Sequence, residues 1–131
     1  MRYLLDSDVV IDHLKNIRQV TDLIGKLEEH DVFLNMVTYM EVYQGIYRDP
    51  EPIVVEAQFM ELLDSVGIAL FTEAVARRCA LLREGLKHSG RRVRQRALDL
   101  ITAATELESD LFLVTRNTAD YDDIPCLRLH T

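Results

Sequence analysis

The chain has 131 residues, of which 48% are hydrophobic and 28% are charged. This length suits a single domain, residues 1–131, with a buried core, and the composition excludes a disordered tail or a fibre. No apolar run approaches the roughly 20 residues that cross a bilayer, and Asp6 interrupts the N-terminus before a secretory signal could form. We therefore expect no membrane segment and a cytoplasmic location.

The balance of 15 basic against 22 acidic residues gives a formal net charge of −7. Such acidity argues against a protein that holds nucleic acid by general electrostatic attraction. The cations are unevenly distributed, because the segment 87–96 has no acid and holds Lys87, Arg91, Arg92, Arg94 and Arg96. This basic segment, which is expected to be mainly a loop, could contact phosphate groups, or it could be a solvated surface.

The chain begins with a pattern that is typical of a buried strand followed by helices. Residues 2–5 form a short apolar run that stops at Asp6, as a parallel strand does before its polar carboxyl end. Ser7 or Asp8 is expected to cap the helix that follows. A second helix is expected over residues 20–29.

The next two elements predict a second strand-to-helix connection. Residues 32–34 form a short apolar strand, and Thr38 is expected to open a helix. Glu41 would then lie in the first turn of that helix. Its apolar residues follow the spacing of one helical face and are expected mainly to pack in the core: Met36, Met40, Tyr43 and Tyr47.

The second half of the chain continues this alternation. Pro52 favours the start of a helix that ends near Gly67, and Thr72 caps a long helix that ends at residues 88–90. The other expected elements are a strand over residues 68–71, a helix over 97–108, a strand over 111–114 and a short strand within 126–129. Strands that alternate with helices predict an α/β sandwich with a mainly parallel central sheet.

Acidic residues recur where strands end and helices begin, at Asp6, Glu41, Asp99 and Asp120. In a parallel sheet, functional sites form beyond the carboxyl ends of the strands. Hard ions such as Mg²⁺ and Mn²⁺ prefer the oxygen ligands that convergent carboxylates provide. A metal ion held in this way can activate water for attack on a phosphodiester. The pattern therefore favours a metal-dependent hydrolase.

Each acid also has a purely structural explanation. Asp6 could cap the first helix, and Glu41 stands three residues after Thr38, as in a capping box. Asp99 could stabilise the positive end of a helix dipole, and Asp120 could be a solvated turn residue. No single acid decides between ligand and cap.

Four sequence strings occur in an order that resembles a known family: "LLDSDVVID", "TYMEVYQG", "ALDLITAATE" and "LVTRNTADYDDIPCLRL". Together they resemble the PIN-domain ribonucleases, and most closely the VapC toxins of bacterial toxin–antitoxin pairs. The resemblance implies a PIN-like α/β/α sandwich and an endoribonuclease whose Mg²⁺ or Mn²⁺ ligands are Asp6, Glu41 and Asp99. It further implies a homodimer that a VapB-type antitoxin inhibits.

The chain departs from the commoner family pattern in two places. Asp8 stands where such proteins often have Asn, and it could add a metal ligand or cap the helix. Asn117 stands where many members carry a fourth acid, so Asp120 is a candidate fourth ligand, with Asn117 as a substrate or outer contact. Thr115 could orient these groups by hydrogen bonding. Within the basic segment, the candidates for RNA contact are Arg91, Arg92 and Arg94.

Two other functions remain open at this point. The Asp6-Ser7-Asp8 loop also resembles the acidic loop of haloacid dehalogenase-type phosphatases, in which the first Asp is a nucleophile. That chemistry needs a later Lys, whereas the chain has none after Lys87. The third reading is a non-catalytic PIN-like module that binds RNA or protein, and such a module should tolerate Asp99→Asn.

Overall fold

The computed structural model describes residues 1–130, which form one five-stranded sheet covered by helices on both faces. All strand pairs are parallel, in the order β3-β2-β1-β4-β5. The strands are β1 (Arg2–Leu5), β2 (Asp31–Asn35), β3 (Gly67–Ala69), β4 (Phe112–Val114) and β5 (Leu129–His130). The helices are α1 (Ser7–Leu14), α2 (Arg18–Leu27), α3 (Met36–Arg48), α4 (Pro52–Leu63), α5 (Glu73–His88), α6 (Ala97–Ser109) and the short 3₁₀ turn η1 (Thr118–Asp120).

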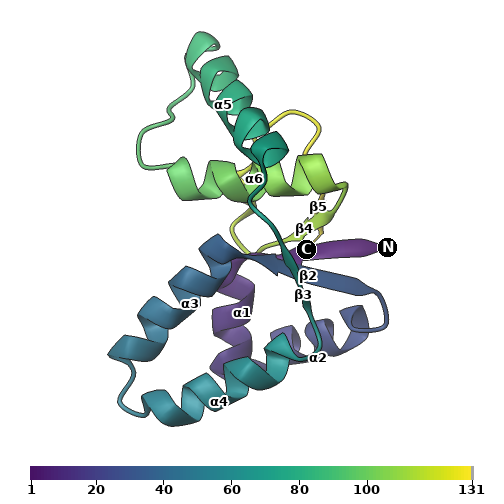
Figure 1. Ribbon diagram of the computed structural model, residues 1–131, viewed down its shortest axis with the longest axis vertical. Helices are drawn as coiled ribbons and strands as arrows, with labels where there is room; N and C mark the ends of the chain where they lie inside the picture. Colours follow the sequence, from purple (N-terminus) through teal and green to yellow (C-terminus); the bar gives the residue numbers. More distant parts are fainter. Residues whose placement is uncertain (131) are drawn as a thin grey trace.

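Figure 1 shows the sheet between two helical layers, with α5 and α6 on one side and α1 to α4 on the other. The central strand serves both layers, because successive side chains of a strand point to opposite faces. Tyr3 and Leu5 belong to the core beneath α1 to α4, whereas Leu4 belongs to the core beneath α5 and α6. The predicted α/β sandwich with a parallel sheet is thereby confirmed. None of the helices within residues 1–130 is long and apolar enough to cross a membrane.

Ser7 and Asp8 do not cap α1 and Thr38 does not cap α3, whereas the alternative in which Asp6 caps the first helix is confirmed. Asp6 caps α1, since its Oδ1 accepts a hydrogen bond of 2.9 Å from the Ser7 backbone N–H. Asn35 caps α3 by accepting from the Thr38 backbone N–H at 3.0 Å, so α3 begins at Met36. Asn is a stronger N-cap than Thr, and here it ends the preceding strand. Glu41 therefore lies beyond the first turn, and it forms no capping box with Thr38.

Of the apolar stripe that was expected to pack α3 into the core, Tyr43 packs against it, and the other three residues are exposed. The exposed fractions are 46% for Met36, 42% for Met40 and 77% for Tyr47. The buried apolar residues of α3 are instead Val42 and Ile46. Apolar residues occur on two faces of this helix, so spacing alone could not identify the inner face.

The edge strands also differ from the predicted ranges. β3 ends at Ala69, whereas the predicted strand ran to residue 71, and β5 begins only at Leu129. Both lie at the edges of the sheet and pair with one neighbour each. Pairing on one side only gives an edge strand fewer ladder hydrogen bonds to define its ends, so local composition predicts them poorly.

The sheet order brings distant acidic segments to one edge. Leu5 pairs with Val114, and the Asp6 N–H donates to the Val114 carbonyl at 3.0 Å, so the chain leaves β1 and β4 side by side. The Thr38 hydroxyl donates to the Leu5 carbonyl at 3.2 Å, which holds the start of α3 against the end of β1. The segments that carry Asp6, Glu41 and Thr115 therefore converge.

Candidate functional site

Asp6 is the most buried of the predicted ligands, with 8% of its surface exposed. Its Oδ2 accepts hydrogen bonds from the Thr115 hydroxyl at 3.0 Å and the Tyr121 hydroxyl at 2.9 Å, while Oδ1 caps α1. Burial, and then the negative charge of Asp8, raise the pKa of Asp6 from 3.8 to about 6 in spite of these donors. The fold thus holds a carboxylate where its charge is costly.

Asp8 lies beside Asp6 and is only partly satisfied. Its Oδ2 accepts from the Arg116 backbone N–H at 3.0 Å and lies 3.3 Å from the Thr115 hydroxyl. Its Oδ1 is buried without a hydrogen-bond partner among the described residues. A buried carboxylate oxygen of this kind is what a bound cation would satisfy. Asn117 contributes its backbone N–H, which donates to the Thr115 hydroxyl at 3.1 Å.

Two hydroxyl groups separate the carboxylates, and each has one proton to donate. The Thr115 hydroxyl faces both Asp6 and Asp8. The Tyr121 hydroxyl faces Asp6 at 2.9 Å and the Asp99 Oδ1 at 3.4 Å. Each hydroxyl can therefore satisfy only one of its two acceptors at a time. The cluster has more carboxylate acceptors than protons, which is a further reason why it suits a cation.

Tyr121 is the residue that the sequence analysis missed. Its side chain is 1% exposed, and its hydroxyl joins an acid from the end of β1 to one from the start of α6. Burial, and then the charges of Asp6 and Asp99, raise its pKa, so the hydroxyl remains a donor. The only local signal was an aromatic residue beside Asp120, and nothing in that signal indicates its partners.

The pKa values of the remaining acids also depend on the neighbouring carboxylates. Burial, followed by the charges of Asp6 and Asp8, raises the pKa of Glu41. Burial, followed by the charge of Asp120, raises the pKa of Asp99, which lies in the first turn of α6 as predicted. Because the charge of each carboxylate affects the pKa of its neighbours, the predicted acids form one electrostatic cluster.

The cluster is not assembled as a metal cage. Within residues 1–130, no three His, Cys, Asp or Glu side chains are grouped closely enough to hold a metal ion as they stand. The donor set nevertheless fits Mg²⁺ or Mn²⁺, because it offers carboxylate oxygens and one unpaired buried oxygen of Asp8. The hydroxyls of Thr115 and Tyr121 lie between carboxylates that would otherwise repel one another.

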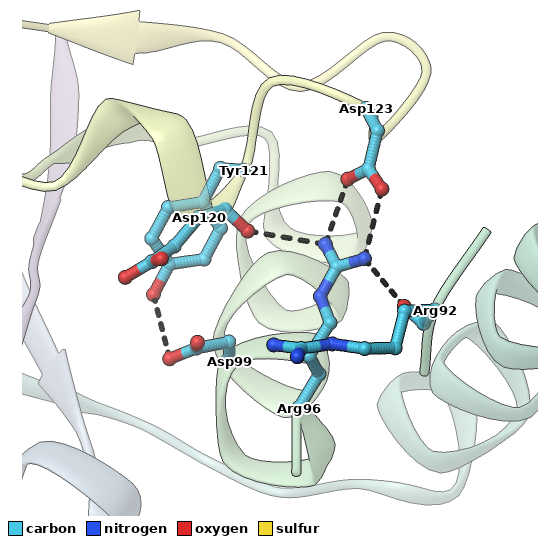
Figure 2. A network of polar contacts seen from close by, with 6 residues as sticks. All are labelled: Arg92, Arg96, Asp99, Asp120, Tyr121 and Asp123. Atoms are coloured by element: carbon cyan, nitrogen blue, oxygen red, sulfur yellow. Dashed lines mark hydrogen bonds and ion pairs between the residues drawn. The ribbon is translucent and has the colours of Figure 1, made fainter. Parts of the chain in front are cut away.

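A cleft of about 340 Å³ joins part of the basic segment to the acids. Its walls are formed by Arg91, Arg92, Gln95, Arg96, Asp99, Ala119, Asp120 and Asp123. Figure 2 shows the Arg92 side chain extending toward Asp99. Arg94, the third candidate RNA contact, is not among the lining residues. A larger cleft of about 460 Å³, lined by residues of α1, α2 and α4, includes none of the predicted site residues.

Tyr121→Phe is expected to lower the free energy of unfolding of the metal-free protein by about 1.5–3 kcal/mol, because a buried carboxylate loses a hydrogen-bond donor. Urea unfolding with a chelator present measures the change. Tyr3→Phe is the matched control, since Tyr3 is also buried but its hydroxyl has no hydrogen bond among the described residues. Equal losses in the two variants would contradict the bridging role of Tyr121.

A comparison with protein families identifies the fold that carries this site. The family described as PIN domain matches residues 3–125. The chain belongs to the PIN domain family. This confirms the resemblance drawn from the four sequence strings. In the phosphatase alternative Asp6 would be a nucleophile that faces solvent, whereas its carboxylate is buried and caps α1.

Solved structures similar to this PIN domain come from toxin–antitoxin complexes. VapBC2 from Rickettsia felis, bound to a DNA fragment from its promoter, has a TM-score of 0.88 at 19% identity and covers 99% of this chain and 98% of that chain. FitAcB from Neisseria gonorrhoeae gives 0.84 at 25%, covering 98% and 96%. A toxin–antitoxin complex from Klebsiella pneumoniae gives 0.72 at 26%, covering 94% and 92%. Among curated proteins, no sequence match is found.

Proposed function

We propose that this PIN domain is a metal-dependent endoribonuclease. The observation that carries the proposal is the convergence of Asp6 and Asp99 on one buried hydroxyl, beside the unpaired oxygen of Asp8. Asp6, Glu41 and Asp99 would hold Mg²⁺ or Mn²⁺, with Asp8 and Asp120 as further candidate ligands. When bound, the ion lowers the pKa of a water molecule and offsets the charge that develops on the phosphate.

The chain's own residues have distinct parts in this proposal. Thr115 donates to the Asp6 carboxylate, and its hydroxyl is itself held by the Asn117 N–H, which fixes the direction of the metal-facing acids. Arg91 and Arg92 line the cleft that also contains Asp99, so they are placed to contact the phosphates of a bound RNA strand. Arg94 is then left to a more peripheral contact.

We further propose that the protein is the toxin of a VapBC-type pair, acts in the cytoplasm and forms a homodimer that a VapB-type antitoxin inhibits. Support comes from similar proteins whose structures were solved as VapBC or toxin–antitoxin complexes. The chain itself exposes apolar side chains on α3, which would suit a protein partner. Met36, Met40 and Tyr47 are the exposed residues there.

Metal removal tests the enzymatic proposal. Purified wild-type protein is incubated with total RNA and Mg²⁺, and the newly formed RNA ends are mapped. We expect cleavage that EDTA stops and added Mn²⁺ restores, with no cleavage of a DNA strand of the same sequence. A non-catalytic PIN-like module would bind RNA under all these conditions without producing new ends. Cleavage that persists in EDTA would contradict the metal-dependent mechanism.

A further inference from the structure

Arg96 makes a dense set of contacts at the edge of the acidic cluster. Its guanidinium forms two hydrogen bonds with the Asp123 carboxylate, at 2.7 and 2.8 Å. It also donates to the Asp120 carbonyl at 3.1 Å and to the Arg92 carbonyl at 2.8 Å. Figure 2 shows all four bonds radiating from one side chain. The Arg96 and Asp123 side chains are only 12% and 14% exposed.

These bonds tie together three segments that the proposed nuclease needs. Arg96 occupies the N-cap position of α6, three residues before Asp99. The Asp120 carbonyl belongs to η1, and the Arg92 carbonyl belongs to the basic segment. Within the described part of the chain, Arg96 and Tyr121 supply every side-chain hydrogen bond between residues 117–124 and residues 96–109.

The positive charge of Arg96 is paired within the protein. Asp123 forms a two-point ion pair with it, and this contact lowers the pKa of Asp123 and raises the pKa of Arg96. By contrast, Arg91 and Arg92 line the same cleft without an ion pair among the described residues. Arg91 and Arg92 are therefore the residues available to contact phosphate, and Arg96 has a structural role.

The Asp120 and Asp99 carboxylates would repel each other without such a contact. Asp99, Asp120 and Arg96 line the same cleft, so the Arg96 cation lies near both carboxylates. Tyr121 and Ile124 anchor the far side of the segment that carries Asp120 in the core beneath α6. Arg96 binds the Asp120 end of this segment through the Asp120 carbonyl and Asp123. A planar guanidinium suits this task, because it bonds a carboxylate and a carbonyl at the same time.

We propose that Arg96, paired with Asp123, is a positioning residue that holds Asp120 beside Asp99 and keeps the Arg92 backbone at the same cleft. This inference rests on the proposed metal-dependent nuclease, and it goes beyond it by assigning a role to two residues that neither bind the metal nor contact the RNA. The pair acts through Asp120, so its loss should weaken metal binding before it affects the fold.

The test measures Mn²⁺ binding by titration calorimetry on the full chain without RNA. Arg96→Lys keeps the positive charge but loses the planar guanidinium that bonds several acceptors at once. Asp123→Asn removes the negative charge that Arg96 pairs with. We expect each variant to bind Mn²⁺ about 10- to 100-fold more weakly. Hydrogen exchange at residues 117–124 should become faster in both. Thermal unfolding, measured without metal, should show that each variant remains folded.

Arg78→Lys is the matched control, because Arg78 also bridges two elements through a carboxylate, Glu108, at 3.2 Å, but neither residue belongs to the cleft. It should bind Mn²⁺ like the wild type. Wild-type affinity in both Arg96→Lys and Asp123→Asn would overturn this inference alone. A wild-type protein that binds no Mn²⁺ would overturn the proposed function together with it. A loss of affinity that only follows the loss of folded protein would overturn the positioning role.

Discussion

Asp6→Asn is expected to reduce metal-dependent RNA cleavage by more than about 100-fold while the protein stays folded. Loss of a group around a bound metal already costs about 10- to 100-fold, so loss of Asp6, a proposed ligand, should exceed that range. Asn has nearly the same shape and caps helices as well as Asp does, so α1 should keep its N-cap. The change therefore removes a charge from the centre of the cluster and keeps the helix cap, although the Asn amide nitrogen cannot accept the two hydrogen bonds that Asp6 Oδ2 receives.

The measurement is the initial rate of cleavage at saturating Mg²⁺, with thermal unfolding as a check on the fold. Asp122→Asn is the control. It removes one negative charge from an exposed position in the acidic turn between Asp120 and Asp123, and its cleavage rate should equal that of the wild type. Asp6→Asn protein that is folded and cleaves RNA within a few-fold of the wild type would show that Asp6 is a helix cap and not a ligand.

Glu106→Gln is expected to remove a large part of the pH dependence of stability. Glu106 lies in α6 with 1% of its surface exposed, and its Oε2 has no hydrogen-bond partner among the described residues. Its Oε1 lies 3.6 Å from the Arg128 Nε, a contact too long to offset burial. Burial raises the pKa of Glu106 from 4.5 to about 7.

The sign of the effect follows from proton binding. Because the folded state holds the Glu106 proton more tightly than the unfolded state, stability falls as pH rises from 4.5 to about 7. This shift corresponds to roughly 3 kcal/mol at higher pH, since each pKa unit is worth about 1.4 kcal/mol. Gln carries no charge at any pH, so the Glu106→Gln variant should be more stable than the wild type above pH 7.

Urea unfolding of the wild type and the variant at pH 5 and pH 8 measures this difference. The free energy of unfolding of the variant should be close to that of the wild type at pH 5 and higher at pH 8. The gain at pH 8 is reduced by the loss of the Arg128 ion pair. Glu29→Gln, at an exposed position, controls for the removal of one negative charge. A variant that loses as much stability between the two pH values as the wild type would show that Glu106 is ionised in the folded protein without penalty.

Local pattern was sufficient wherever neighbours within one turn decide the structure. The apolar run of β1, the cap at Thr72 and the breaks at residues 88–90 were all predicted, because each depends on a few consecutive side chains. The buried parallel strands followed from uninterrupted apolar composition. The four acidic strings, in their order, were enough to predict the PIN domain family.

The sequence by itself therefore determined the parallel α/β architecture, the family and the acids that converge at one edge of the sheet. Only the tertiary structure decided which groups satisfy those acids. Tyr121 is separated by 115 residues from Asp6, and Arg96 by 27 from Asp123, yet both pairs are in hydrogen-bond contact. Such contacts depend on which strand ends and helix starts lie side by side. That arrangement follows from the packing of the whole sheet and leaves no trace in local spacing.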